Sequence, residues 1–267
     1  MYNSVIFAPN DLVQPEFMKK TTLLLVSFLW LTGAFAQEKK KDSLKAPKKD
    51  WRKLDLSNRP GDHVLIQYGA DTWMNRPDTI RQGGGFSRHF NLYFMLDKPF
   101  KTDPRFSLGL GVGVGSSNIF FDRMQINLNG TTPQIPIRRM DTLPRFDKYK
   151  LTTVYAEIPV ELRYFSKPDK PNKSFKAAIG LRVGTMLKAQ TKGKGFEDAN
   201  GNALRDRNAV TKESGRRYMN GTRISATARV GLGNFSLHAA YQLTQTFRET
   251  QGPPVRPFSI GLTISGL

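Results

Sequence analysis

Apolar residues recur at every second position in one segment of the chain after another, and this alternation limits the possible folds more than any other feature. In residues 88–96, phenylalanine and leucine alternate with more polar side chains, and in residues 106–115 leucine and valine alternate with glycine. A period of two places the two sets on opposite faces of a β-strand. A helix with so many glycines would lose about 1 kcal/mol at each of them. The pattern therefore predicts strands.

Eight segments share this alternation, and most are about as long as a strand that crosses a bilayer at a tilt, which needs roughly 9–11 residues. They are residues 64–73, 88–96, 106–115, 152–164, 175–188, 223–230, 235–244 and 258–265. One face of these segments is almost purely apolar, whereas the other combines glycine and serine with charged side chains. Lipid on the outside and a packed polar lumen on the inside produce this division.

The connections between the segments alternate in length. Short ones lie near residues 97–104, 166–173 and 231–234, and mostly longer ones lie near residues 74–87, 117–148, 190–218 and 247–257. Short periplasmic turns and long external loops are typical of outer-membrane barrels. The sequence therefore predicts an all-β fold, an eight-stranded antiparallel transmembrane β-barrel of the outer-membrane type over residues 61–267. The even strand count places both termini in the periplasm.

The beginning of the chain predicts export. Two lysines follow Met18, an apolar run spans residues 23–31, and small residues precede the peptide bond after Ala36. This is the pattern of a cleaved signal peptide, and the apolar run is too short for a spanning helix. We expect residues 18–36 to be that signal peptide and residues 1–17 to lie upstream of the true start and not to be translated.

Residues 37–60 are predicted to form a disordered basic linker on the periplasmic side, because the segment is rich in lysine and has almost no apolar periodicity. Its basic residues are Lys39, Lys40, Lys41, Lys45, Lys48, Lys49, Arg52 and Lys53. A tether to an anionic partner and a solvated tail without a partner both explain this composition.

Charge and cysteine content limit the partners. The chain has no cysteine, which excludes a lipid anchor on a processed amino terminus and excludes disulfides. It carries 41 basic and 22 acidic residues, a formal net charge of +19. For an exported protein, this charge favours outer-membrane lipid, lipopolysaccharide, and envelope or secretion-system proteins as partners, and nucleic acid is not expected.

Charged side chains also occur on the face predicted to line the lumen. Glu157, Glu161 and Arg163 lie on one segment, Arg182 and Lys188 lie on the next, and Arg229 follows later, all out of phase with the apolar positions. Buried charges need partners. The sequence predicts that Glu157, Glu161, Arg163, Arg182 and Arg229 form an ion-pair network that plugs the barrel. A conducting or catalytic role for the glutamates is the alternative.

Residues 154–164, Val-Tyr-Ala-Glu-Ile-Pro-Val-Glu-Leu-Arg-Tyr, resemble the "Y-x-E-I-P-x-x-x-(R/K)-Y" strand of the PorT-like outer-membrane β-barrel family. Residues 236–244 and 258–264 are similar to the last two strands of that family. The resemblance implies a small outer-membrane barrel and, through the family's namesake, a role in type IX protein secretion. The chain departs from many barrels in ending with Gly266-Leu267 instead of an aromatic residue.

One loop has the spacing of a calcium site. Asp198, Asn200, Asn202 and Asp206 offer oxygen ligands at alternating positions, as calcium prefers. Ala209 stands where the acidic twelfth ligand of a calcium loop belongs. The sequence thus allows Ca²⁺ as a cofactor of the third external loop and indicates no other. An Asn-Gly turn at the tip of a hairpin explains the same residues.

Signals for catalysis are weak. Ser236 and His238 share one strand face, but no carboxylate can be assigned to them from the sequence, so a polar pair that fills the lumen is the favoured interpretation. We therefore expect a non-enzymatic protein with a structural or interaction role in the cell envelope, as a component of or accessory to type IX secretion. The alternative is a porin-like narrow channel or an outer-membrane enzyme that moves or modifies a small molecule.

Aromatic residues gather near the ends of the predicted strands. Such residues suit girdles at the two membrane interfaces, and ordinary packing is the alternative. They are Trp73, Phe120, Phe121, Tyr149, Tyr164, Phe165, Phe247 and Phe258.

Overall fold

The computed structural model describes residues 63–83, 86–170, 173–198 and 200–266. The predicted signal peptide, the residues before it and the basic linker of residues 37–60 lie outside the described residues. Among the residues that are described, no helix has the length and apolar character needed to cross a bilayer.

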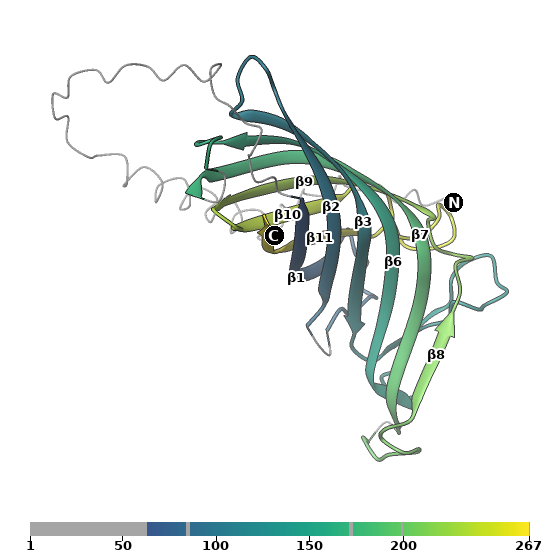
Figure 1. Ribbon diagram of the computed structural model, residues 1–267. Coiled ribbons are helices and arrows are strands. Elements are labelled where there is room, and N and C mark those ends of the chain that lie inside the picture. The colour runs from purple at the N-terminus through teal and green to yellow at the C-terminus, as the bar shows by residue number, and fades with distance from the viewer. Residues whose placement is uncertain (1–62, 84–85, 171–172, 199, 267) are drawn as a thin grey trace, which may run out of the picture. The chain divides into compact units, whose positions relative to one another are not determined.

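Eight strands form a closed antiparallel ring (Figure 1). They are β1 (Val64–Met74), β2 (Arg88–Pro99), β3 (Phe106–Phe121), β6 (Arg145–Phe165), β7 (Phe175–Glu197), β9 (Thr222–Leu232), β10 (Phe235–Gln242) and β11 (Arg256–Ser265). Each strand pairs with the next strand of the ring, and β1 pairs with β11 to close it, with Leu65 opposite Ser265. The predicted eight-stranded antiparallel barrel is confirmed.

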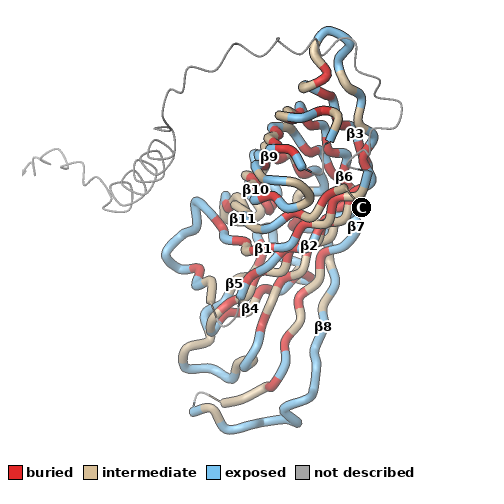
Figure 2. Tube along the Cα trace, turned by 60° about the vertical axis from the view of Figure 1, so that its left-hand side comes forward, coloured by how far each residue is buried: buried red, intermediate tan, exposed pale blue. Residues whose placement is uncertain are grey.

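The two faces of the wall divide as the alternation predicted. Along β2, Phe90 and Phe94 are exposed, whereas His89, Asn91 and Tyr93 between them are buried. The same alternation of buried and exposed positions runs along the other strands of the ring (Figure 2). The exposed side chains of the wall are mostly apolar, because this face meets lipid, and the polar side chains are buried in the lumen.

The two ends of the barrel differ. Residues 100–105, 166–174 and 233–234 connect strands at one end, and the chain enters β1 and leaves β11 at this same end. The connections at the other end, residues 75–87, 122–144, 198–221 and 243–255, are longer.

The long-loop end contains secondary structure that the alternation did not reveal. Beyond the wall, β6 and β7 continue as a ribbon, and β8 (Val210–Ser214) pairs with the outer part of β7 (Figure 1). Within the loop after β3, β4 (Met124–Ile126) and β5 (Ile137–Arg139) form a small hairpin.

A β-bulge in β7 changes which face its outer part presents. Tyr155 pairs with Met186, but Val154 pairs with Lys188, so Leu187 is an extra residue in β7. A bulge of this kind shifts the alternation by one position. Lys188, predicted to line the lumen, is therefore exposed on the outer face, and that prediction was wrong.

Candidate functional site in the barrel lumen

Glu157 is the centre of one group of buried charges. It lies on β6 with only 2% of its surface exposed. Its Oε1 accepts a hydrogen bond from Nε of Arg223 at 2.7 Å. Its Oε2 lies 3.6 Å from Nη1 of Arg182 and accepts a hydrogen bond from the Tyr93 hydroxyl. Two cations and one hydroxyl thus surround one carboxylate and compensate its buried charge.

Glu161 is the centre of a second group nearer the short-turn end. Its Oε2 accepts hydrogen bonds from Nε of Arg163 at 2.9 Å and from Nη2 of Arg229 at 3.1 Å. Nη1 of Arg163 lies 3.5 Å from Oδ1 of Asp97, which also accepts a hydrogen bond from the Ser107 hydroxyl at 2.6 Å. Carboxylates and guanidinium groups therefore alternate along this part of the lumen.

The structure brings all five predicted luminal charges into contact with an opposite charge, but in two groups instead of one. Arg163 and Arg229 contact Glu161, and Arg182 contacts Glu157. The prediction missed Arg223 and Asp97. Arg223 stands on the polar face of its own segment, so the alternation could have indicated it. Asp97 was assigned to a turn, whereas β2 continues to Pro99.

The glycines of the luminal face make room for these side chains. A Cβ atom on Gly109 would lie 2.6 Å from Nε of Arg163, and one on Gly115 would lie 2.7 Å from Oε2 of Glu157. Gly184 is equally confined, since its Cβ would lie 2.8 Å from Cγ of Glu157. The alternation of valine or leucine with glycine in β3 thus reflects lipid on one side and the charge groups on the other.

A chain of hydrogen bonds on the luminal side connects residues of β1, β2, β10 and β11 beside these charges. Oδ1 of Asp71 is 2.7 Å from Nδ1 of His89, whose Nε2 is 2.8 Å from Nε2 of His238. Nδ1 of His238 is 2.9 Å from the hydroxyl of Thr263. Each histidine therefore has both ring nitrogens engaged. The cavity beside this chain holds about 20 Å³, about the space of one water molecule.

Ser236 and His238 do not form a nucleophile–base pair. The two ring nitrogens of His238 bond to His89 and Thr263, and within the described residues the buried Ser236 hydroxyl has no hydrogen-bond partner. The carboxylate that the sequence could not assign, Asp71, contacts the other histidine.

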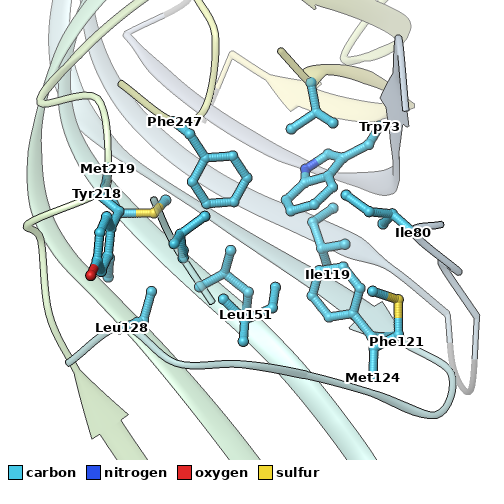
Figure 3. Packing of buried hydrophobic residues seen from close by; sticks show 14 of the residues in the cluster. Trp73, Ile80, Ile119, Phe121, Met124, Leu128, Leu151, Tyr218, Met219 and Phe247 are labelled. Atoms are coloured by element: carbon cyan, nitrogen blue, oxygen red, sulfur yellow. The ribbon is translucent and has the colours of Figure 1, made fainter. Parts of the chain in front are cut away.

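An apolar cluster closes the long-loop end of the lumen (Figure 3). Trp73 from β1 packs edge-on against Phe121 at 5.2 Å and against Phe247 at 5.7 Å between ring centroids. The β4–β5 hairpin contributes Met124 and Ile126, and the hydroxyl of Tyr149 donates to the carbonyl of Ile126 at 2.7 Å. The long loops are thus held across the mouth by a hydrophobic core of their own.

This cluster corrects the predicted aromatic girdle. Trp73, Phe121, Tyr149 and Phe247 belong to the cluster, and Phe165 at the short-turn end is buried as well, so these five side chains do not face an interface. The prediction failed because it used only the position of these residues near strand ends, whereas Trp73, Phe121, Tyr149 and Phe165 stand at the inward positions of the alternation. Phe247 lies in the connection 243–255, and the alternation carries no information about loops that fold over the mouth.

The predicted calcium ligands build a tight turn. Oδ1 of Asp198 accepts the backbone N–H groups of Asn200 and Asn202, each at 2.8 Å, and the Asn202 amide donates to Oδ2 at 3.0 Å. The side-chain hydrogen bond from Asn202 is the largest cause that holds the pKa of Asp198 below its usual value. Asp206 accepts from the backbone of Asn208 instead. In the described part of the chain, no three acidic or histidine side chains gather as a metal site.

A closed ring of eight antiparallel strands with an apolar exterior, a charged interior and one end of longer loops defines a small transmembrane β-barrel of the outer-membrane type. Comparison with protein families agrees: the model of the outer membrane protein beta-barrel domain matches residues 65–248, which is well over half of the chain. The chain belongs to this family, and its location is the outer membrane. Comparison with curated proteins and with solved structures gave no match.

Proposed function

We propose that this protein is a closed, non-enzymatic barrel that has a structural or interaction role in the cell envelope. The filled lumen carries this proposal. The charge groups around Glu157 and Glu161 occupy its middle, and the apolar cluster around Trp73 and Phe247 covers its outer mouth. A barrel of eight strands leaves an interior that side chains can fill, so loops and rim remain as the surfaces for contact with partners.

Single-channel recording in planar bilayers tests this proposal. A filled barrel shows no steady open level, whereas a small-molecule channel, the alternative function, shows one. The hydrogen-bonded chain from Asp71 through His89 to His238 is the feature that favours a transport or modification role. A steady conductance that disappears in His89→Phe would favour that alternative.

We further propose that both termini face the periplasm and that the longer loops face outward. The strand ends at Val64 and Ser265 lie at the end with the short turns, and that end of outer-membrane barrels is periplasmic. Protease added to intact cells should then cut the exposed segment 202–209. Cleavage only after the outer membrane is permeabilised would reverse this orientation.

The resemblance to PorT-like barrels supports a narrower proposal, that the protein is a component of or accessory to type IX secretion. The resemblance rests mainly on the Glu157-Ile158-Pro159 strand, and Glu157 holds the central charge group. Envelope and secretion-system proteins are the expected partners. Crosslinking in intact cells, followed by purification from outer membranes, tests this. Recovery of the barrel without secretion components, together with unchanged secretion in a deletion strain, would remove the secretion role.

A further inference from the structure

Lysines stand directly opposite one another on the ribbon that β6, β7 and β8 form beyond the wall. Lys150 of β6 pairs with Lys192 of β7, which pairs in turn with Lys212 of β8. One row further out, Lys148 pairs with Lys194. Directly paired residues of antiparallel strands present their side chains on the same face. Each of these rows is therefore a cross-strand run of positive charge.

The first row continues onto the neighbouring strands of the barrel. Phe120 of β3 pairs with Lys150, and the Lys150 ammonium group lies 5.5 Å from the centroid of the Phe120 ring. The guanidinium carbon of Arg88 lies 5.7 Å from the same centroid. We call the cations of the two rows the basic stripe. It consists of Arg88, Lys148, Lys150, Lys192, Lys194 and Lys212.

The chain does not neutralise the basic stripe. Across the described residues, no carboxylate forms an ion pair with any of its six cations. Glu213 is adjacent in sequence to Lys212, but it pairs with Thr191, whose side chain is buried on the other face. Like charges directly opposite each other destabilise a sheet. An external anion would offset that repulsion.

The position of the basic stripe indicates which anion binds to it. On the outer face of β2, Phe90 stands two residues from Arg88. On β3, Asn118 and Ser116 lie between Phe120 and the exposed Val114 and Val112, so the stripe lies just beyond the apolar band, at its long-loop side. In the proposed orientation this is the level of the outer-leaflet headgroups. We propose that the basic stripe binds the phosphate groups of lipopolysaccharide. This inference rests on the proposed orientation and names the surface that contacts the lipid.

Binding of lipopolysaccharide to the folded full-length protein in detergent tests the proposal. The probes are lipopolysaccharide with phosphorylated lipid A and the same material after enzymatic dephosphorylation. The variant carries Lys150→Gln, Lys192→Gln and Lys212→Gln. The matched control carries Lys98→Gln, Lys101→Gln and Lys167→Gln, three exposed lysines at the short-turn end. Slower migration of boiled than of unheated samples first establishes that each variant is folded.

Each basic side chain near an anionic surface contributes about a fivefold factor at low salt, so the triple variant should lose at least about tenfold in affinity for the phosphorylated probe. The control should stay within about twofold, and the arginine version of the triple variant should retain binding. Unchanged binding by the glutamine variant, or equal binding of the dephosphorylated probe or of phosphatidylglycerol vesicles by the native protein, overturns the inference. Cleavage of the loops only from the periplasmic side would instead refute the proposed orientation.

Discussion

Glu157 and Arg223 form an ion pair across a strand that separates them. Glu157 lies on β6 and Arg223 lies on β9, and Gly184 of β7 is the register partner of both. Because Gly184 has no side chain, Nε of Arg223 reaches Oε1 of Glu157 at 2.7 Å. The pair therefore depends on β6, β7 and β9 being in register, and it joins the luminal faces of β6 and β9 across β7.

Removal of the carboxylate should destabilise the barrel more than removal of one of its cations. Glu157→Gln leaves Arg223 and Arg182 buried without a counter-charge, and an uncompensated buried charge costs about 3–5 kcal/mol. Arg223→Met leaves Glu157 with Arg182 and Tyr93, so the loss in unfolding free energy should be smaller. Urea unfolding in lipid vesicles measures both. Equal losses would show that the two arginines do not share one carboxylate.

The space at Gly184 should not accommodate even a methyl side chain without a loss of stability. A methyl group there would lie 2.8 Å from Cγ of Glu157, so Gly184→Ala should lower the unfolding free energy by about 1–3 kcal/mol. Gly221→Ala is the control, since a Cβ atom on Gly221 meets nothing within 4 Å. The same urea titration compares the two variants. A loss no larger than that of the control would mean that the ion pair can move aside.

The alternation of side chains accounts for what could be predicted from the sequence. The eight strands of the wall and the inward direction of Glu157 and Arg229 follow from a period of two, which is a local property. The Glu157–Arg223 contact could not be predicted, because its register depends on strands far apart in sequence. The outward direction of Lys192 depends on the extra residue in β7, and nothing in the alternation marks that bulge.

The packing at the long-loop end was also beyond prediction, and its contribution to stability can be tested. Phe247 is fully buried between Trp73 and the outer loops, and Phe→Ala in a core typically costs about 3–5 kcal/mol. Phe247→Ala should loosen the β4–β5 hairpin while the wall stays closed, because the wall keeps its ladders of hydrogen bonds. Limited proteolysis should cut residues 122–144 faster, with the heat-modifiable band retained. Leu243→Ala, at an exposed site on the lipid side, is the control.

The assignment of faces predicts a large loss of unfolding free energy at one position of the wall and almost none at a nearby one. Leu181 of β7 is 52% exposed on the lipid side, and an arginine near the bilayer midplane costs about 2–4 kcal/mol. Ser225 of β9, opposite Arg182 in the register, is buried on the luminal side. Among the described residues its hydroxyl forms no hydrogen bond with another side chain, so Ser225→Ala should change the unfolding free energy little. Unfolding in vesicles should therefore separate Leu181→Arg from Ser225→Ala by at least about 2 kcal/mol. Similar values for the two variants would mean that the lipid-facing and luminal faces of β7 are assigned incorrectly.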